Sequence, residues 1–214
     1  MNILHFLSHD LMLPILQFFY NISKNYGVAI ILLTVAVKVV LYPLTLQSTR
    51  QMKAMQKVQP ELSKVQEKYK GKPEELQREM MKLYKEHGVN PLGGCLPTLA
   101  QLPFFIALFI TLTSKEVTAL MGSAGAAANS FLWIQDLAKP DNTYLLVLLI
   151  GLTTYWTQKM LSAVSSSNPT QQQMAIIMPF FIAFVSFQFP SGVQLYWVVS
   201  NLLTILQQGY ILKA

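Results

Sequence analysis

The chain has 214 residues, of which 52% are hydrophobic and only 12% are charged, whereas soluble domains carry about a quarter charged residues. This balance predicts a protein embedded in lipid. The formal net charge is +6, but most basic residues fall between positions 47 and 91. That segment lacks the aromatic stacking platform that nucleic-acid binding requires, so sequence-specific recognition of nucleic acid is not expected.

The first 25 residues are predicted to form an interfacial amphipathic helix. They lack the positively charged start of a secretory signal peptide, so this segment is expected to belong to the mature fold. Pro14 argues against a straight membrane span. Apolar residues recur at helical spacing, namely Ile3, Leu7, Leu11, Ile15, Phe18 and Ile22.

The remainder, residues 26–214, is predicted to be an all-α, polytopic membrane core. A helix needs roughly twenty mostly apolar residues to cross a bilayer, and five windows qualify or nearly qualify. Residues 190–192 form a short link, so the last two helices are expected to be antiparallel neighbours. The five predicted spans are 28–46, 96–112, 144–160, 174–189 and 193–212.

The basic segment 47–91 is predicted to be cytoplasmic, because lysine and arginine in short loops favour that side. With five spans, the chain start then lies outside and the chain end lies in the cytoplasm. A coiled-coil-like apolar seam and the turn residues 71–73 predict a helical hairpin. Its charges fit two alternatives: a solvated surface, or a docking surface for a ribosome, a targeting factor or anionic headgroups.

Lys38 lies near the middle of the first predicted span. A charge at the bilayer centre costs roughly 2.5 to 3.5 kcal/mol on insertion scales, and about 12 Å of helix separates Lys38 from the cytoplasmic end of its span. No aspartate or glutamate falls inside the five windows. These observations favour a polar, hydrated cavity around the ammonium. The candidate groove residues are Lys38, Thr34, Gln101, Gln158, Tyr196, Trp197 and Asn201, with Thr153, Thr154 and Ser200 as further polar candidates.

Other functions are less well supported by the sequence. A channel or small-solute transporter is the alternative, because polar residues inside a membrane also mark solute paths. No enzyme, cofactor or metal site is predicted: His5 and His9 lack the glutamate of a zinc-protease motif, and Cys95 has no second thiol. A phosphate-binding GxxxxGK[ST] loop is absent from the sequence.

Several motifs, in order and at sensible spacing, resemble the YidC family of membrane protein insertases. The similarity extends from about Tyr26 to the chain end. Each motif is weak alone, and together they are specific. They are Tyr42-Pro43-Leu44-Thr45, the segment 84–95 (YKEHGVNPLGGC), the segment 132–137 (LWIQDL), Gln158-Lys159-Met160, Phe189-Pro190-Ser191-Gly192, Leu195-Tyr196, and Val199-Ser200-Asn201-Leu202.

The resemblance implies a five-helix core whose groove opens to the cytoplasm and to lipid and is closed on the outer side. In that family a basic groove residue contacts the client, and Lys38 occupies its place where many relatives have arginine. Lysine keeps the charge without the bidentate fork. The 214 residues of the chain contain neither the large outer domain nor the basic tail of some relatives, so tail-dependent docking is not expected.

On this interpretation the chain is an insertase and chaperone for membrane proteins. Short hydrophilic client segments would cross through the groove, and apolar segments would pass into lipid. The implied partners are nascent membrane proteins and the lipid bilayer, with a ribosome and the Sec translocon as open alternatives. The expected location is the bacterial plasma membrane, with the thylakoid membrane as the alternative.

Overall fold

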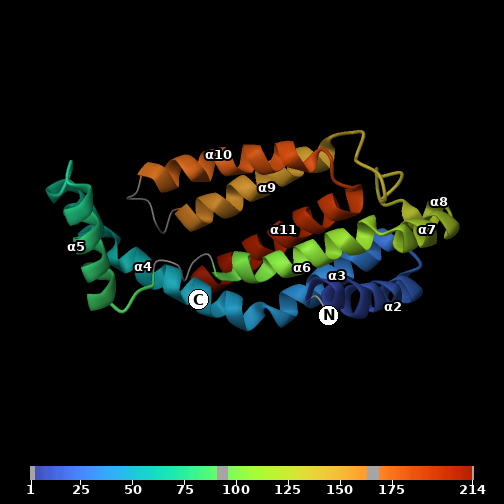
Figure 1. The fold of residues 1–214 in the computed structure, drawn as a ribbon, viewed down its shortest axis with the longest axis horizontal. Helices are drawn as coiled ribbons and strands as arrows, with labels where there is room; N and C mark the ends of the chain where they lie inside the picture. Colours follow the sequence, from blue (N-terminus) through green and yellow to red (C-terminus); the bar gives the residue numbers. More distant parts are fainter. Residues whose placement is uncertain (1–2, 91–95, 163–168, 214) are drawn as a thin grey trace.

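A computed structural model describes residues 3–90, 96–162 and 169–213, and these residues form an all-α fold with one isolated β-bridge between Phe131 and Ile134 (Figure 1). The prediction of an all-α protein is therefore confirmed. The elements are α1 (Ile3–His5), the π-helix η1 (Phe6–Met12), α2 (Leu13–Ser23), α3 (Tyr26–Val40), α4 (Tyr42–Lys68), α5 (Pro73–Glu86), α6 (Leu96–Thr113), α7 (Lys115–Ser123), α8 (Ala126–Asn129), α9 (Leu145–Ser162), α10 (Pro169–Ser186) and α11 (Ser191–Lys213).

The first predicted span is broken rather than continuous. α3 ends at Val40, and α4 begins at Tyr42 at an angle of 61° to it. Pro43, in the first turn of α4, has no N–H to donate to the carbonyl of Val39, which bends a helix at this point. α4 then continues well past residue 46, the predicted end of the span, and projects from one end of the bundle.

α9 lies between α10 and α11 in the described part of the chain (Figure 1). The prediction that the last two helices are packed neighbours is therefore wrong: they run in opposite directions, but they meet only near the turn that joins them. α10 packs closely on α9, where an added Cβ at Gly151 would lie 3.5 Å from the Cβ of Ala183. On its other side α9 bonds to α11 through Asn201.

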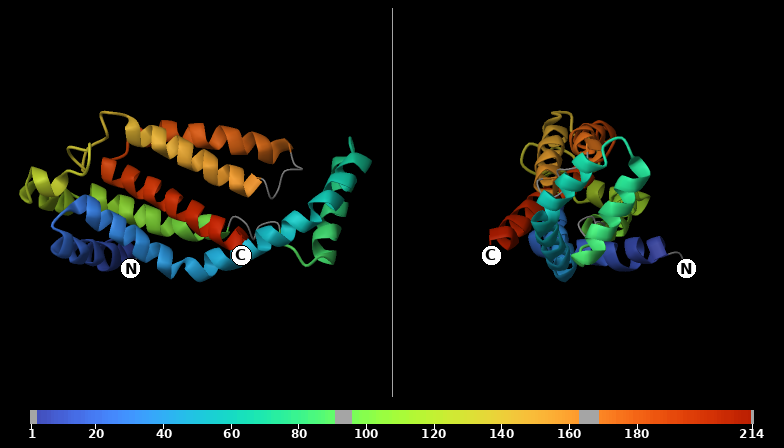
Figure 2. Two further views of the ribbon diagram at one scale, coloured as in Figure 1. Left: turned by 180° about the vertical axis from the view of Figure 1, so that it is seen from behind. Right: turned by 90° about the vertical axis from the view of Figure 1, so that its left-hand side faces the viewer.

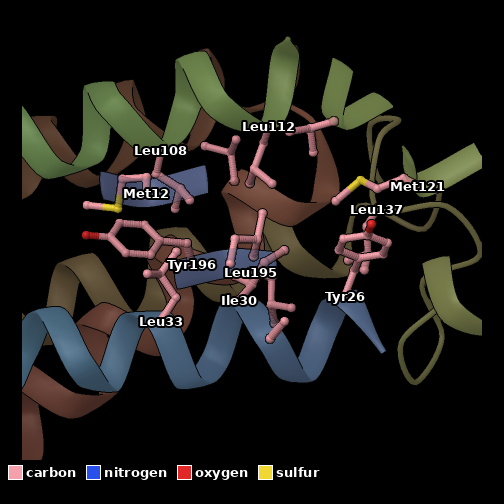
Figure 3. Close-up of a cluster of buried hydrophobic side chains, with 14 of the residues drawn as sticks. Met12, Tyr26, Ile30, Leu33, Leu108, Leu112, Met121, Leu137, Leu195 and Tyr196 are labelled. Carbon is pink, nitrogen blue, oxygen red and sulfur yellow. The ribbon is translucent and has the colours of Figure 1, made fainter. Parts of the chain in front are cut away.

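The main core lies between α2, α3, α6 and α11 (Figure 3). Gly192 permits their close approach, since an added Cβ there would lie 3.1 Å from Ile30 Cδ1 and 3.3 Å from Leu112 Cδ1. Burial of such side chains stabilises the bundle by about 25 cal/mol per Å² of apolar surface. The core side chains labelled in Figure 3 are Met12, Tyr26, Ile30, Leu33, Leu108, Leu112, Met121, Leu137, Leu195 and Tyr196.

A second, smaller core holds the predicted helical hairpin together. α5 turns back beside the far end of α4 (Figure 2, left). Met52, Met55, Val58 and Leu62 of α4 are buried there. The covering side chains of α5 are Met80, Leu83 and Tyr84, which repeat at three- to four-residue spacing as an amphipathic helix requires. The hairpin is thus a separate packing unit attached to the bundle through α4.

The N-terminal helices extend to one side of the bundle (Figure 2, right). The apolar spacing seen in the sequence buries Met12, Leu13 and Leu16 in the main core. The turns of η1 are wider than those of an α-helix, and the carbonyl of Ser8 accepts a hydrogen bond of 3.0 Å from Thr111 Oγ1 on α6. That contact fixes the segment beside the bundle, while Phe18 and Ile22 remain exposed.

The segment between α7 and α9 covers the N-terminal ends of three helices. The Asn25 side chain caps α3 and also donates to the carbonyls of Ala127 and Ser130, at 3.1 and 2.8 Å. The Ser191 hydroxyl at the start of α11 donates to the carbonyl of Lys139 at 2.6 Å. The ring of Phe131 lies directly on α3. These bonds join helices that are far apart in sequence.

Asp141 binds the first turn of α9 within the same segment. Burial acts to raise the pKa of its carboxyl, but hydrogen bonds from the N–H of Leu146, from Thr143 and from the Trp133 side chain outweigh burial and lower that pKa. A negative charge at a helix N-terminus is also favourable. Asp141 therefore stabilises the covering segment in its ionised form.

The five predicted membrane spans overlap in sequence with helices α3, α6, α9, α10 and α11. Within the residues that the structure describes, none of them alone combines the length and the apolar character needed to cross a membrane. Two bent pairs meet those requirements jointly, Tyr26–Val40 with Tyr42–Lys68 and Leu99–Thr113 with Lys115–Ser123.

Candidate functional site

Lys38 is buried in the last turn of α3, with only 7% of its surface exposed. Its ammonium donates hydrogen bonds to Gln101 Oε1 at 2.9 Å and to Thr204 Oγ1 at 2.8 Å. Both acceptors are uncharged, and within the described ranges no carboxylate lies within ion-pair distance of Lys38. The positive charge is therefore hydrogen-bonded but not neutralised.

The acceptors of Lys38 are held in place by α11. Gln101 Nε2 donates to Tyr196 Oη at 2.6 Å and to Ser200 Oγ at 3.0 Å, which turns the amide oxygen of Gln101 toward the ammonium. Thr204 Oγ1 donates to the carbonyl of Ser200 at 2.8 Å, so its lone pairs face Lys38. Residues 196, 200 and 204 are four apart and share one helix face. One stripe of α11 thus orients the ammonium.

A cavity of about 220 Å³ opens beside this network. Helices α3, α4, α6, α9, α10 and α11 all contribute to its wall. Its polar lining is Lys38, Thr45, Gln101, Thr154, Thr157, Gln158, Ser200, Asn201, Thr204 and Gln208, and its apolar lining is Leu102, Phe105, Ile182 and Trp197. This volume has room for several water molecules.

The structure brings most of the predicted groove residues together. Lys38, Gln101, Gln158, Trp197 and Asn201 all line the cavity. Among the further polar candidates, the same is true of Thr154 and Ser200.

Two predicted groove residues lie outside the cavity lining. The Thr34 hydroxyl is fully buried and donates to the carbonyl of Ile30 at 2.6 Å within its own helix, a common alternative for threonine in helices. Tyr196 is 2% exposed and belongs to the main core, from which its hydroxyl accepts the bond from Gln101. Tyr196 thus positions the Gln101 side chain from the main core without lining the cavity.

Sequence reasoning missed four polar residues of the lining. Thr204 and Gln208 follow Ser200 at steps of four along α11, a periodicity that could have identified them. Thr157 is one turn beyond the candidate Thr153 on α9. Thr45 carried no comparable signal, because its position depends on the bend between α3 and α4.

Asn201 joins the two sides of the cavity. Its Nδ2 donates to Thr153 Oγ1 and to Thr154 Oγ1, each at 3.0 Å. α9 therefore packs on α11 through polar contacts at the level of the cavity.

The two N-terminal histidines lie apart from the cavity. The His5 and His9 rings stack with centroids 4.9 Å apart, and His9 Nδ1 is 4.0 Å from a carboxylate oxygen of Glu116. Among the described residues, no group of three histidine, cysteine or acidic side chains is arranged to hold a metal ion. Cys95 lies outside those residues.

Comparison with known proteins shows extensive similarity. The model of the family described as 60Kd inner membrane protein matches residues 18–214. The membrane protein insertase YidC of Geobacter sulfurreducens is 47% identical over 197 residues, which is 92% of this chain and 35% of that protein. The chain therefore spans about a third of that relative.

A relative of similar length also matches. The membrane protein insertase YidC of Fusobacterium nucleatum subsp. nucleatum is 40% identical over 209 residues, covering 96% of this chain and 97% of that protein. A solved structure described as an active YidC insertase with its first transmembrane domain resolved has a TM-score of 0.72 at 31% identity. The match covers 92% of this chain and 44% of the chain in that structure.

Proposed function

Since the chain belongs to the 60Kd inner membrane protein family, we propose that it inserts client proteins into a bacterial membrane. Short hydrophilic segments of a client enter the cavity beside Lys38, and apolar segments pass along the helices into lipid. The proposed activity requires no catalytic step and no cofactor. The bacterial relatives named as insertases support this general function.

The uncompensated charge of Lys38 carries the proposal. A buried ammonium whose acceptors are all neutral attracts the acidic or polar part of an incoming chain. The surrounding protein has a lower dielectric than water, so the attraction is stronger than at an exposed surface. Room for several water molecules keeps the client segment partly hydrated, which lowers the cost of taking it out of bulk water.

The outward surfaces of α9 and α10 support release of apolar segments into lipid. They present large apolar side chains at high exposure, which soluble proteins rarely do over a continuous area. A client helix moving along them exchanges one apolar contact for another and gains about 0.8 kcal/mol for each methylene that leaves water. These side chains are Leu148, Leu152, Tyr155, Trp156, Ile176, Ile177, Phe180, Phe181 and Phe184.

The proposed orientation puts the hairpin of α4 and α5 in the cytoplasm, the chain start outside and the chain end inside. This follows from the basic residues of segment 47–91. The hairpin projects from the bundle and its charged surface is exposed, which suits a ribosome or the Sec translocon as further partners. Clients and the bilayer are the partners that the insertion activity itself requires.

Insertion of a single-span client with an acidic tail into liposomes carrying this protein tests the proposal. The unmodified protein is compared with Lys38→Arg, Lys38→Ala and Lys38→Glu. Arginine keeps the charge and should retain insertion. Loss of one charge contact at about 4 Å is worth about 1 to 4 kcal/mol, so alanine should lower insertion about fivefold or more, and glutamate further.

Lys139→Ala is the matched control, because that lysine is exposed in the segment between α7 and α9, where it pairs with Asp136, and does not line the cavity. A client with a neutral tail should respond little to any change at Lys38. Equal insertion by the unmodified protein and all three Lys38 variants would refute the electrostatic mechanism. Ion conductance or solute uptake without insertion would instead support the channel or transporter alternative.

A further inference from the structure

Lys38 is the only charged residue that lines the cavity among the residues that the structure describes. The other lining residues are neutral, including Gln101 and Thr204, the two acceptors of its ammonium. Taking a full charge out of water is costly unless an opposite charge accompanies it. The charge of Lys38 therefore favours a counter-ion, which the described side chains around the cavity do not supply.

The ammonium of Lys38 keeps one hydrogen-bond donor in reserve. An ammonium has three N–H groups, and Lys38 uses two of them, at 2.9 Å to Gln101 and at 2.8 Å to Thr204. The third has no acceptor within the described part of the chain. Since both acceptors and Lys38 itself line the cavity, the ammonium lies at the cavity wall. One N–H of the charged group therefore remains for a ligand.

Gln158 of α9 adds an amide to the same cavity. It is half-buried and lines the cavity, and its side chain makes no hydrogen bond to any described residue. It is also absent from the six buried side chains that have an enclosed, unpartnered oxygen, so both of its amide atoms have accessible surface. An amide N–H binds an anion more strongly than a neutral acceptor. The cavity thus offers an anion a charge and a free amide donor.

We propose that the cavity holds one small monovalent inorganic anion, such as chloride, as the counter-ion of Lys38 while no client is bound. The volume of about 220 Å³ accommodates such an ion together with water. A divalent anion is disfavoured, because it would leave an unbalanced negative charge at low dielectric. The acidic group of a client displaces the ion, so the charge of Lys38 is balanced before and after binding. This last step rests on the proposed insertion function.

Iodide quenching of Trp197 tests the anion site, because Trp197 lines the cavity and iodide quenches indole fluorescence on contact. The chain has three tryptophans, so Trp133→Phe with Trp156→Phe leaves Trp197 as the only emitter. Iodide is added in nonionic detergent at constant ionic strength, with sulfate as the balancing anion. Lys38 is kept, or changed to methionine or arginine. A protein that retains only Trp156 is the matched control, since Trp156 is exposed and does not line the cavity.

Quenching of Trp197 should saturate, with half of the effect at about 1 to 100 mM iodide, the range for one ion-pair contact at about 4 Å. Chloride should reverse it, which tests the site without any change at Lys38. Lys38→Arg should keep the saturable quenching. Lys38→Met should lose it, while quenching by neutral acrylamide stays the same and shows that the cavity is still open. Equal iodide quenching in Lys38→Met, or no saturation when Lys38 is kept, would overturn the site.

Displacement by a client separates this inference from the proposed function. An acidic-tailed client peptide without tryptophan should release the iodide and restore the emission of Trp197, and its neutral-tailed counterpart should not. Saturable iodide binding that the acidic client fails to displace would keep the anion site and refute the client contact at Lys38. Insertion that depends on Lys38 without any saturable iodide quenching would refute the anion site and leave the proposed function standing.

Discussion

Gly27 is the position where one added methyl group should do most damage to the bundle. A Cβ built there lies 2.4, 2.5 and 2.6 Å from three atoms of the Phe131 side chain. An ordinary contact begins near 3.4 Å, so Gly27→Ala requires the ring or the helix to move by about 1 Å. Overpacking of this kind costs about 1 to 3 kcal/mol, and we expect a loss of stability in that range.

Thermal unfolding of the purified protein in detergent measures the effect. Gly209→Ala is the control, since it also adds a methyl group inside a helix but nothing lies within 4 Å of the new Cβ. It should be neutral or stabilising by up to about 1 kcal/mol. The cost of Gly27→Ala should nearly vanish when Phe131 is already glycine, because one of the three close atoms is the Phe131 Cβ, which an alanine would keep. An unchanged cost in that background would show that contact with Phe131 is not the cause.

Two further predictions concern regions outside the cavity. The lowered pKa of Asp141 means that its stabilising effect is present above its unfolded value of about 3.9 and is lost as pH falls through the folded value. Melting temperature should therefore fall below about pH 4, and less steeply in Asp141→Asn. Leu62→Ala, at a side chain 1% exposed in the hairpin core, should cost about 2 to 5 kcal/mol locally. Hydrogen exchange should then rise in α5 while protection of α3 is unchanged, and equal loosening of both would contradict the separate packing of the hairpin.

The helical composition and the burial of Lys38 among neutral polar groups could be predicted because both depend on local chemistry. Apolar windows of membrane length favour helices in any arrangement. A buried lysine without an acidic partner in any span must find neutral polar groups. Gln101 does accept a hydrogen bond from Lys38. Thr34 instead donates its hydroxyl to the carbonyl of Ile30 in its own helix, which depends on its rotamer and packing rather than on composition.

The packing order of the helices could not be predicted from the chain alone. A short link at 190–192 suggested that α10 and α11 pack side by side, yet α9 lies between them. That arrangement depends on two long-range features: the close approach of Gly151 to Ala183, and the bonds from Asn201 to α9. Thr45 was missed for a similar reason, because the bend before α4 decides which face of that helix meets the cavity.

The continuity of α4 links the cavity mechanically to the hairpin. Thr45 lines the cavity about 6 Å along the helix from the bend at Leu41, and Leu62 lies in the hairpin core about 31 Å from the same point. The two positions are the short and long arms of a lever with a ratio of about five. A swing of about 5 Å at the hairpin, pivoting at the bend, therefore displaces the backbone at Thr45 by about 1 Å. A displacement of that size changes the shape of the cavity wall.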